Sequence, residues 1–389
     1  MTAVGFILAL NTIQNSGLFA NRIVLALFAL ELGASPLLVG VLTALFSMAP
    51  AILAVTVGRL ADRFGVRWLL VIGSTGAGLG LLLPYFLPSL AAVSVASALC
   101  GLSWVCYNVT TQNLTGLLST PESRARNFTN YSLTTSAGTL LGPLIGGFSI
   151  DQIGHAQSCL ALALLAFMPL LMLLTRWNSL EKGAVRPADV KAAPTGGTLL
   201  LFRDPRIRQT IISASFLSSG LNLFSAYMPV YGRAVGLSAS VIGIVMAMNA
   251  TAAFAIRLLL PRMIAWLKEE KVLALSFCSG AAALVLIPMF QHPVLLGLLA
   301  FIFGLGMGAG QPIVIMLIFH FAPAGRSGEA IGLKITTNHL TNIVSPIVFG
   351  GIATLLGLSP MFWLNGLMMA AGCYISWTKN THQAMQKLE

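Results

Sequence analysis

Twelve long apolar stretches, separated by short polar segments, constrain the fold of this chain more than any other feature. A helix that crosses a bilayer needs roughly 20 mostly apolar residues. Within a membrane, only helices and closed barrels satisfy their own backbone hydrogen bonds. Charged residues make up 8% of the chain, whereas soluble domains have about 25%. We therefore predict an all-α integral membrane protein with twelve transmembrane helices.

The expected spans fill the chain almost completely. They cover residues 4–30, 36–57, 68–87, 90–118, 128–150, 156–175, 209–231, 239–260, 272–290, 293–318, 329–354 and 359–377. The first run has no basic region before it, so we expect a membrane helix there and not a signal peptide. The polar stretch between the sixth and seventh spans is the candidate linker. We therefore expect an N-terminal half (1–176), a central loop (177–207) and a C-terminal half (208–389).

The basic residues predict the orientation in the membrane. Arg59, Arg63 and Arg67 share one expected loop, and further basic residues crowd the central loop, while Arg233 is the exception in the alternate loops. Lys and Arg accumulate in cytoplasmic loops of membrane proteins. We therefore expect both termini and the central loop to face the cytoplasm, in a bacterial inner membrane. The net charge of +11 follows from this bias, so we expect no nucleic-acid partner.

The second half of the chain repeats residues of the first half at one ungapped offset of 203 positions. The matching pairs include Ser16 with Ser219, Gly33 with Gly236, Gly40 with Gly243, Arg59 with Arg262, Gly101 with Gly304, Pro143 with Pro346 and Gly154 with Gly357. Parallel internal repeats of this kind are typical of transporters built from two related bundles. We therefore expect two pseudo-symmetric six-helix halves.

Two segments resemble signatures of one transporter family. The segment Gly58-Arg-Leu-Ala-Asp-Arg-Phe-Gly-Val-Arg67 is similar to the loop 2–3 signature of the major facilitator superfamily. The run from Gly138 to Gly147 resembles the helix 5 motif of its drug:proton antiporter branches. The resemblance implies a secondary transporter that works by alternating access, and neither an enzyme nor a cofactor-dependent protein. It also implies efflux of a small molecule in exchange for protons.

The resemblance further implies a conformational latch on the cytoplasmic side. In the family, the aspartate of the first motif contacts a basic residue and the positive N-terminal end of helix 11. A carboxylate near a helix N-terminus is stabilised by about 0.3–1 kcal/mol. The corresponding residues here are Asp62, either Arg124 or Arg126 as its partner, and the motif glycines Gly58 and Gly65. The alternative is that the arginines of this loop only set the topology.

The helix 5 motif places small residues on one helix face. Gly138, Gly142 and Gly146 recur every four residues, followed by Gly147. Small residues allow a neighbouring helix to approach closely, and Pro143 removes a backbone hydrogen bond and permits a kink. We expect these residues to have the exporter role that the resemblance implies. Ordinary packing of small residues is the alternative.

Polar side chains within the expected spans indicate a cavity. Such side chains are costly in a membrane and usually face a cavity or one another. They gather on single faces of the expected helices 1, 4, 7 and 10, which line the central cavity in the resembled family. The candidate substrate contacts are Arg22, Asn11, Asn15, Asn108, Asn222 and Gln311. Arg22 would bind an anionic group or a carboxylate partner, or alternatively reach the outer headgroups.

The charged residues also limit the substrate and the coupling group. No acidic residue lies near the middle of an expected helix, so a neutral or anionic amphiphile fits better than a lipophilic cation. Lys334 and His339 are the candidate coupling residues, since His titrates near neutral pH, although a lone His in a helix is more often a packing residue. Proton-coupled efflux is our first hypothesis. Uptake of an organic anion or metabolite by proton symport is the alternative.

The remaining expectations concern cysteines and assembly. The five cysteines lie in apolar runs without a Cys-x-x-Cys or Cys/His spacing. We therefore expect neither a disulfide framework nor a metal site. The expected partners are a small-molecule substrate, protons and the lipid bilayer, and we expect a monomer.

Overall fold

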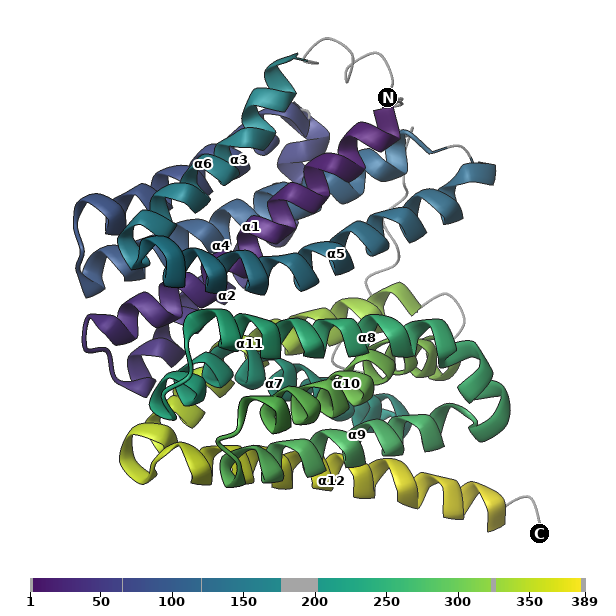
Figure 1. Ribbon diagram of the computed structural model, residues 1–389. Coiled ribbons are helices and arrows are strands. Elements are labelled where there is room, and N and C mark those ends of the chain that lie inside the picture. Colours follow the sequence, from purple (N-terminus) through teal and green to yellow (C-terminus); the bar gives the residue numbers. More distant parts are fainter. Residues whose placement is uncertain (1–2, 65, 120, 176–201, 323–326, 386–389) are drawn as a thin grey trace. The chain divides into compact units, whose positions relative to one another are not determined.

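The computed structural model describes residues 3–64, 66–119, 121–175, 202–322 and 327–385, and in these ranges it contains helices and no strand (Figure 1). The helices of the first half are α1 (Ala3–Glu31), α2 (Pro36–Phe64), α3 (Val66–Phe86), α4 (Leu90–Leu117), α5 (Pro121–Ile153) and α6 (His155–Thr175). Those of the second half are α7 (Pro205–Ala234), α8 (Ala239–Leu267), α9 (Glu269–Leu286), the short 3-10 helix η2 (Ile287–Met289), α10 (Pro293–Phe321), α11 (Ser327–Leu356) and α12 (Leu358–Met385).

Twelve of these helices are long and apolar enough to cross a membrane. Each corresponds to one of the twelve spans expected from the sequence, which confirms the fold class. Several helices are longer than their apolar spans. For example, α2 continues to Phe64 and α5 begins at Pro121, because polar residues at a helix end keep the helical backbone without adding to the apolar signal.

The chain forms two compact units. Unit 1 contains residues 1–192 together with residues 232–247, and unit 2 contains residues 193–231 and 248–389. Residues 232–247 are the end of α7, the following turn and the start of α8, which we name the α7–α8 tip. The expected central loop, 177–207, lies mostly outside the described residues, so the expected boundaries of the halves stay a prediction.

The internal repeat is visible in the turns between helices. Gly33, Gly154, Gly236 and Gly357 have φ values of 84°, 80°, 83° and 96°. Such values lie in the left-handed region that glycine adopts at little cost. Around Gly33 and Gly236 there is open space where a side chain would project. The backbone conformation of the turn, and not crowding, therefore explains glycine at these repeated positions.

The helices α1 and α7 are the most enclosed of their units. Within the membrane-spanning windows, 78% of α1 and 72% of α7 is buried. In unit 1, α1 packs against α4, α5 and α6. Polar residues on these two helices are therefore surrounded by protein and not by lipid, which is the setting for the candidate site.

Candidate functional site

One buried amide of α1 connects this helix to α5, and a second buried amide supports the first. The Asn11 Nδ2 atom donates to Thr134 Oγ1 at 2.8 Å and to Thr135 Oγ1 at 3.0 Å. One turn later, Asn15 Nδ2 donates to the carbonyl oxygen of Asn11 at 2.9 Å and to its Oδ1 at 2.8 Å. These hydrogen bonds fix the polar face of α1. A direct substrate contact by Asn11 or Asn15 stays a prediction.

Tyr131 of α5 joins the polar residues of α4 to this network. Its hydroxyl lies 3.1 Å from Thr111 Oγ1 and accepts a hydrogen bond from Asn108 Nδ2 at 3.4 Å. Asn108 Oδ1 in turn accepts from Gln112 Nε2 at 2.6 Å. The sequence prediction included Asn108 but missed Tyr131. The dense run of hydroxyl and amide residues at 129–136 was the signal that could have indicated it.

Arg22 has a different environment from these amides. Its guanidinium lies over the ring of Phe46, 4.4 Å from the ring centroid. The ring centroids of Phe46 and Trp104 are 6.5 Å apart. We name these three side chains the Arg22 cluster. Phe46 is ten residues into α2, about 15 Å along the helix axis from its first residue, so the guanidinium is held at membrane depth. In the described part of the chain, no carboxylate is paired with Arg22. This cation can therefore accept an anionic group.

Unit 2 repeats the α1–α5 arrangement between α7 and α11. Ser218 Oγ donates to Asn342 Oδ1 at 3.1 Å, and Asn222 Nδ2 donates to the carbonyl oxygen of Asn342 at 3.1 Å. The Tyr227 hydroxyl donates to the carbonyl oxygen of Pro346 at 2.6 Å. Asn222 was a predicted substrate contact, whereas Asn342 was missed. Its spacing of one turn from Asn338 on the same helix was the available signal.

Among the described residues, the other candidate residues of unit 2 take no part in these hydrogen-bond networks. Lys334 is buried on α11 with 8% of its surface exposed, and His339 and Gln311 are half-buried. No carboxylate among the described residues is paired with Lys334 or His339. A coupling role for these two residues, and a substrate role for Gln311, stay predictions.

The glycines of the helix 5 motif pack against α1. A Cβ atom at Gly138 would lie 2.5 Å from Asn15 Cβ, and one at Gly142 would lie 2.5 Å from Phe19 Cβ. At Gly146 it would lie 3.0 Å from the carbonyl oxygen of Ala20. The glycine stripe therefore allows α1 and α5 to approach closely, as the packing alternative of the sequence analysis expected.

The C-terminal end of α5 contacts the α7–α8 tip. Asp151 accepts hydrogen bonds from the backbone N–H groups of Ala239 at 3.0 Å and Ser240 at 2.8 Å, and from the Ser240 hydroxyl. These N–H groups belong to the first turn of α8, where the helix dipole favours a negative charge. Next to this contact, Gly147 and Gly243 leave no space for a side chain between α5 and α8.

An ion pair and a polar cavity lie beside Asp151. Arg233 of the tip pairs with Glu31 of α1 at 3.2 Å. A cavity of about 320 Å³ is lined by these two residues together with Asp151 and His155. The sequence prediction missed the role of Asp151. The helix dipole disfavours an acidic residue at the C-terminal end of its own helix. This unfavourable position was the sequence signal that Asp151 has a partner on another helix.

The predicted latch lies partly outside the described residues. This applies to the side chains of Asp62 and Arg124 and to Gly65, while Gly58 belongs to α2 and Arg126 is exposed. The latch therefore stays a prediction.

Comparisons with known proteins decide the family. The family model "Major Facilitator Superfamily" matches residues 4–346. The chain belongs to the Major Facilitator Superfamily. The chain is 21% identical over 369 residues to the uncharacterized MFS-type transporter MJ1560 of Methanocaldococcus jannaschii, covering 92% of each protein. It is 24% identical over 343 residues to the uncharacterized MFS-type transporter YuxJ of Bacillus subtilis, covering 85% of this chain and 83% of that protein.

A shorter match is to a protein named for multidrug resistance. The multidrug resistance protein MdtH of Yersinia pestis is 27% identical over 179 residues, which is 46% of this chain and 43% of that protein.

Solved structures share the fold. The nucleoside transporter NupG has a TM-score of 0.82 at 13% identity, covering 97% of this chain and 99% of that chain. The peptide transporter POT in complex with sulfate has a TM-score of 0.78 at 17% identity, covering 97% and 94%.

Membership of the Major Facilitator Superfamily points to secondary transport by alternating access and not to an enzyme.

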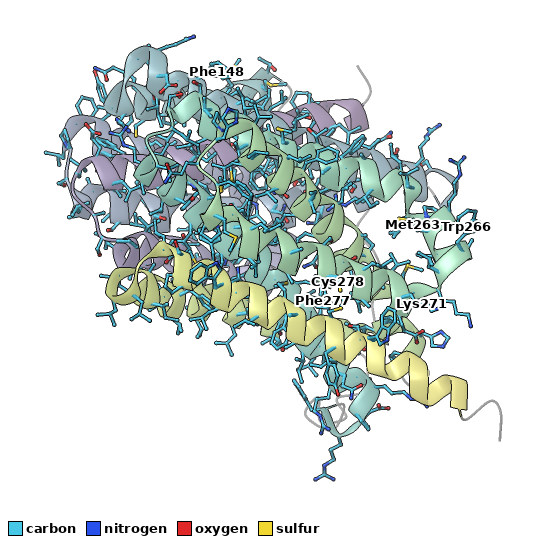
Figure 2. All side chains as sticks on the ribbon, turned by 60° about the horizontal axis from the view of Figure 1, so that its bottom comes forward. Phe148, Met263, Trp266, Lys271, Phe277 and Cys278 are labelled. Carbon is cyan, nitrogen blue, oxygen red and sulfur yellow. The ribbon has the colours of Figure 1, made fainter. Side chains whose placement is uncertain are left out.

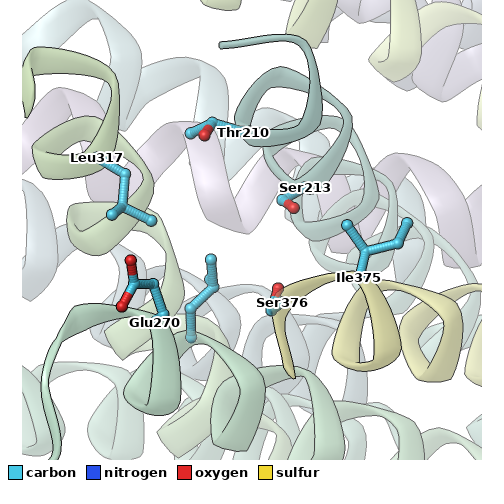
Figure 3. Close-up of a pocket in the computed structure, with 7 residues that line it drawn as sticks. Thr210, Ser213, Glu270, Leu317, Ile375 and Ser376 are labelled. Carbon is cyan, nitrogen blue, oxygen red and sulfur yellow. The ribbon is translucent and has the colours of Figure 1, made fainter. Parts of the chain in front are cut away.

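Two further pockets among the described residues of this superfamily member are small. Figure 3 shows one in unit 2, where Thr210 and Ser213 of α7 face Glu270 of α9 and Ser376 of α12. Its free space of about 10 Å³ holds one water molecule at most. No group of three His, Cys, Asp or Glu side chains in the described ranges is placed to hold a metal ion.

Proposed function

We propose that this transporter exports a small amphiphilic molecule, neutral or anionic, across a bacterial inner membrane in exchange for protons. The observation that carries the proposal is Arg22, whose guanidinium stacks on Phe46 within the span of α1. A charge without a partner at membrane depth is costly. An anionic group of the substrate would provide the missing partner and so gain affinity from this cation.

The hydrogen-bonded amides would position the substrate around Arg22. Asn108 contributes an amide beside the exposed Gln112. Asn11 holds α1 in register with α5, and Asn15 supports Asn11. In unit 2, Asn222 and Gln311 are the corresponding polar candidates. These residues offer hydrogen-bond donors and acceptors in otherwise apolar helices, which suits an amphiphilic molecule.

Two observations support export: a short sequence motif and a partial match to another protein. The run from Gly138 to Gly147 resembles a motif of drug:proton antiporters, and the partial match to MdtH is to a multidrug resistance protein. The distribution of Lys and Arg supports an orientation with both termini in the cytoplasm. In that orientation, the contacts of Asp151 and Glu31 with the α7–α8 tip would lie on the outer side. Asp62 with Arg124 or Arg126 would close the inner side.

Uptake of an organic anion by proton symport is the second candidate function. Arg22, Lys334 and Arg257 are cations within membrane spans. The described acidic residues of the spans lie at helix ends, such as Glu31 and Asp151. A permease for a metabolite with a carboxylate or phosphate group would use these cations equally well, so the direction of proton flux has to separate the two functions.

The test uses the purified protein in liposomes with a pH gradient and a pH-sensitive dye inside. Acidic metabolites, amphiphilic antibiotics and neutral analogues of both are added one at a time. We expect substrate-dependent proton flux in the direction opposite to the substrate. Flux in the same direction would support symport and uptake. Transport of neither class, with the protein shown to be folded by its thermal transition, would overturn both functions.

A further inference from the structure

Two cysteines meet on the surface of unit 2 between α9 and α12. Cys278 Sγ and Cys373 Sγ lie 2.6 Å apart, although the residues are 95 positions apart in the chain. Both residues are free cysteines in this structure, and their sulfur atoms are in direct contact. Figure 2 shows Cys278 beside the ribbon of α12. The sequence offered no such pairing, because neither residue belongs to a cysteine motif.

Glycines of α12 explain why the two helices come close enough. A Cβ atom at Gly372 would lie 2.5 Å from a ring carbon of Phe277, and one at Gly366 would lie 2.7 Å from Val285 Cγ2. Phe277 is fully buried and directly precedes Cys278. Its packing on Gly372 therefore sets the rotation of both helices so that the next residues, Cys278 and Cys373, face each other. A disulfide needs Cα atoms about 4.4–6.8 Å apart, a separation that two helices reach only where they pack closely.

The pair is accessible from the acyl chains of the membrane. Both residues lie within membrane spans, and Cys278 is exposed while Cys373 is half-buried. Cys278 is nine residues after Glu269, about 13 Å along the axis, so it lies well inside a hydrocarbon layer of about 30 Å. Charged aqueous thiols such as glutathione do not enter this layer. Lipid-soluble reagents therefore control the redox state of this pair.

We propose that Cys278 and Cys373 are a membrane-embedded dithiol that a lipid-soluble quinone oxidises to a disulfide. Two S–H bonds break and one S–S bond forms. The two electrons and two protons pass to the quinone, which becomes the quinol. The other three cysteines, Cys100, Cys106 and Cys159, are buried and take no part in the reaction.

The disulfide would cross-link α9 to α12 within unit 2. It closes a loop of 95 positions, and cross-links over long loops restrict the unfolded chain most. Neither α9 nor α12 contributes a residue to the Arg22 cluster or to the contacts of Asp151. We therefore expect oxidation to raise thermal stability and to leave the transport rate unchanged. This inference does not depend on the proposed direction or substrate of transport.

The test treats the full-length protein in liposomes with a short-chain benzoquinone and then unfolds it in SDS for thiol labelling. We expect two of the five thiols to be lost and a peptide linked through Cys278 and Cys373 to be found by mass spectrometry. The oxidised protein should melt roughly 5 °C or more above the reduced protein. Reduction with a lipid-soluble phosphine should restore both values.

Matched variants make the result specific. C278S and C373S should each keep all their remaining thiols and show no shift in melting temperature with quinone, whereas C159S should behave like the unmodified protein. The proposal is overturned if all five thiols survive the treatment, if the linked peptide contains other cysteines, or if the product is a cross-linked dimer on a non-reducing gel.

Discussion

At the scale of single residues, a charge and an amide in a membrane helix have different roles. Asn11 and Asn15 have their hydrogen bonds satisfied by neighbours on α1 and α5. Arg22 has an aromatic ring as its partner. A cation over an aromatic face gains about 0.5–2 kcal/mol, which stabilises the guanidinium without neutralising it. Arg22 therefore keeps its capacity to bind an anion.

Replacing Arg22 tests this role. Arg22→Gln should reduce transport of anionic compounds at least about tenfold, because an ion-paired hydrogen bond contributes roughly 1.5–3 kcal/mol. Neutral compounds should be transported at similar rates. Arg22→Lys keeps the charge and is the control. Initial rates in proteoliposomes measure the effect, and an unchanged preference in Arg22→Gln would leave Arg22 a structural residue.

Tyr131 is a residue whose loss should affect stability more than selectivity. Tyr131→Phe removes the hydroxyl that contacts Asn108 and Thr111. We expect a loss of about 1–2 kcal/mol, since buried polar groups lose a partner. A thermal melt of the purified protein measures it. Tyr85→Phe is the control, because this tyrosine lies at the end of α3, away from the network. Equal melting temperatures in both variants would contradict the assigned role.

At the scale of elements, glycine spacing determines which helices can touch. In α5, the stripe of the motif faces α1, while the following Gly147 faces the start of α8. The same helix therefore has one close contact along its length and another at its end. These contacts use the absence of a side chain, so even one methyl group should disturb them.

Gly142→Ala tests the close contact of α1 and α5. The added methyl would lie 2.5 Å from Phe19 Cβ and 2.8 Å from the carbonyl oxygen of Ser16, so α1 must shift. We expect a loss of about 1–3 kcal/mol, seen as a lower melting temperature and yield. Gly351→Ala is the matched control, because nothing lies within 4 Å of its added methyl. Similar losses in both variants would contradict the packing argument.

The sequence predicted elements much better than contacts. Apolar runs indicate where the chain can cross a membrane, and they located all twelve helices. The partner of a polar residue is not encoded in such a run. Asn11 bonds to Thr134, 123 positions away, and Asp151 bonds to Ser240, 89 positions away. Hydrophobic periodicity identifies the face on which a residue lies, but not the helix that packs on that face, so Tyr131, Asn342 and the cysteine pair were missed.

At the scale of the whole molecule, Asp151 contacts the start of a helix that belongs to both compact units. It stabilises the first turn of α8, and α8 passes from unit 1 into unit 2 at residues 247–248. Alternating access requires that contacts on one side of the membrane open while those on the other close. A charge-assisted contact of one side chain with a helix end can be made and broken without unfolding either helix.

Asp151→Asn should weaken this contact. The charge is lost, and hydrogen bonds to charged groups contribute about 1.5–3 kcal/mol. We expect hydrogen exchange of the amides at 239–242 to become at least about tenfold faster. Asp204→Asn is the matched control, because Asp204 caps its own helix by accepting from the N–H groups of Arg206 and Ile207. It should accelerate exchange at the start of α7 only. Exchange at the tip that is insensitive to Asp151→Asn would sink this role.

The membership of the α7–α8 tip in unit 1 has a consequence for dividing the polypeptide. Ile242 of the tip is completely buried and Ala239 nearly so. A fragment that starts after the central loop would contain this tip without the α5 surface that covers it. Its apolar residues and the first amides of α8 would then be uncovered. The C-terminal half expressed alone should therefore aggregate, whereas two fragments made in the same cell should assemble through Asp151 and Glu31.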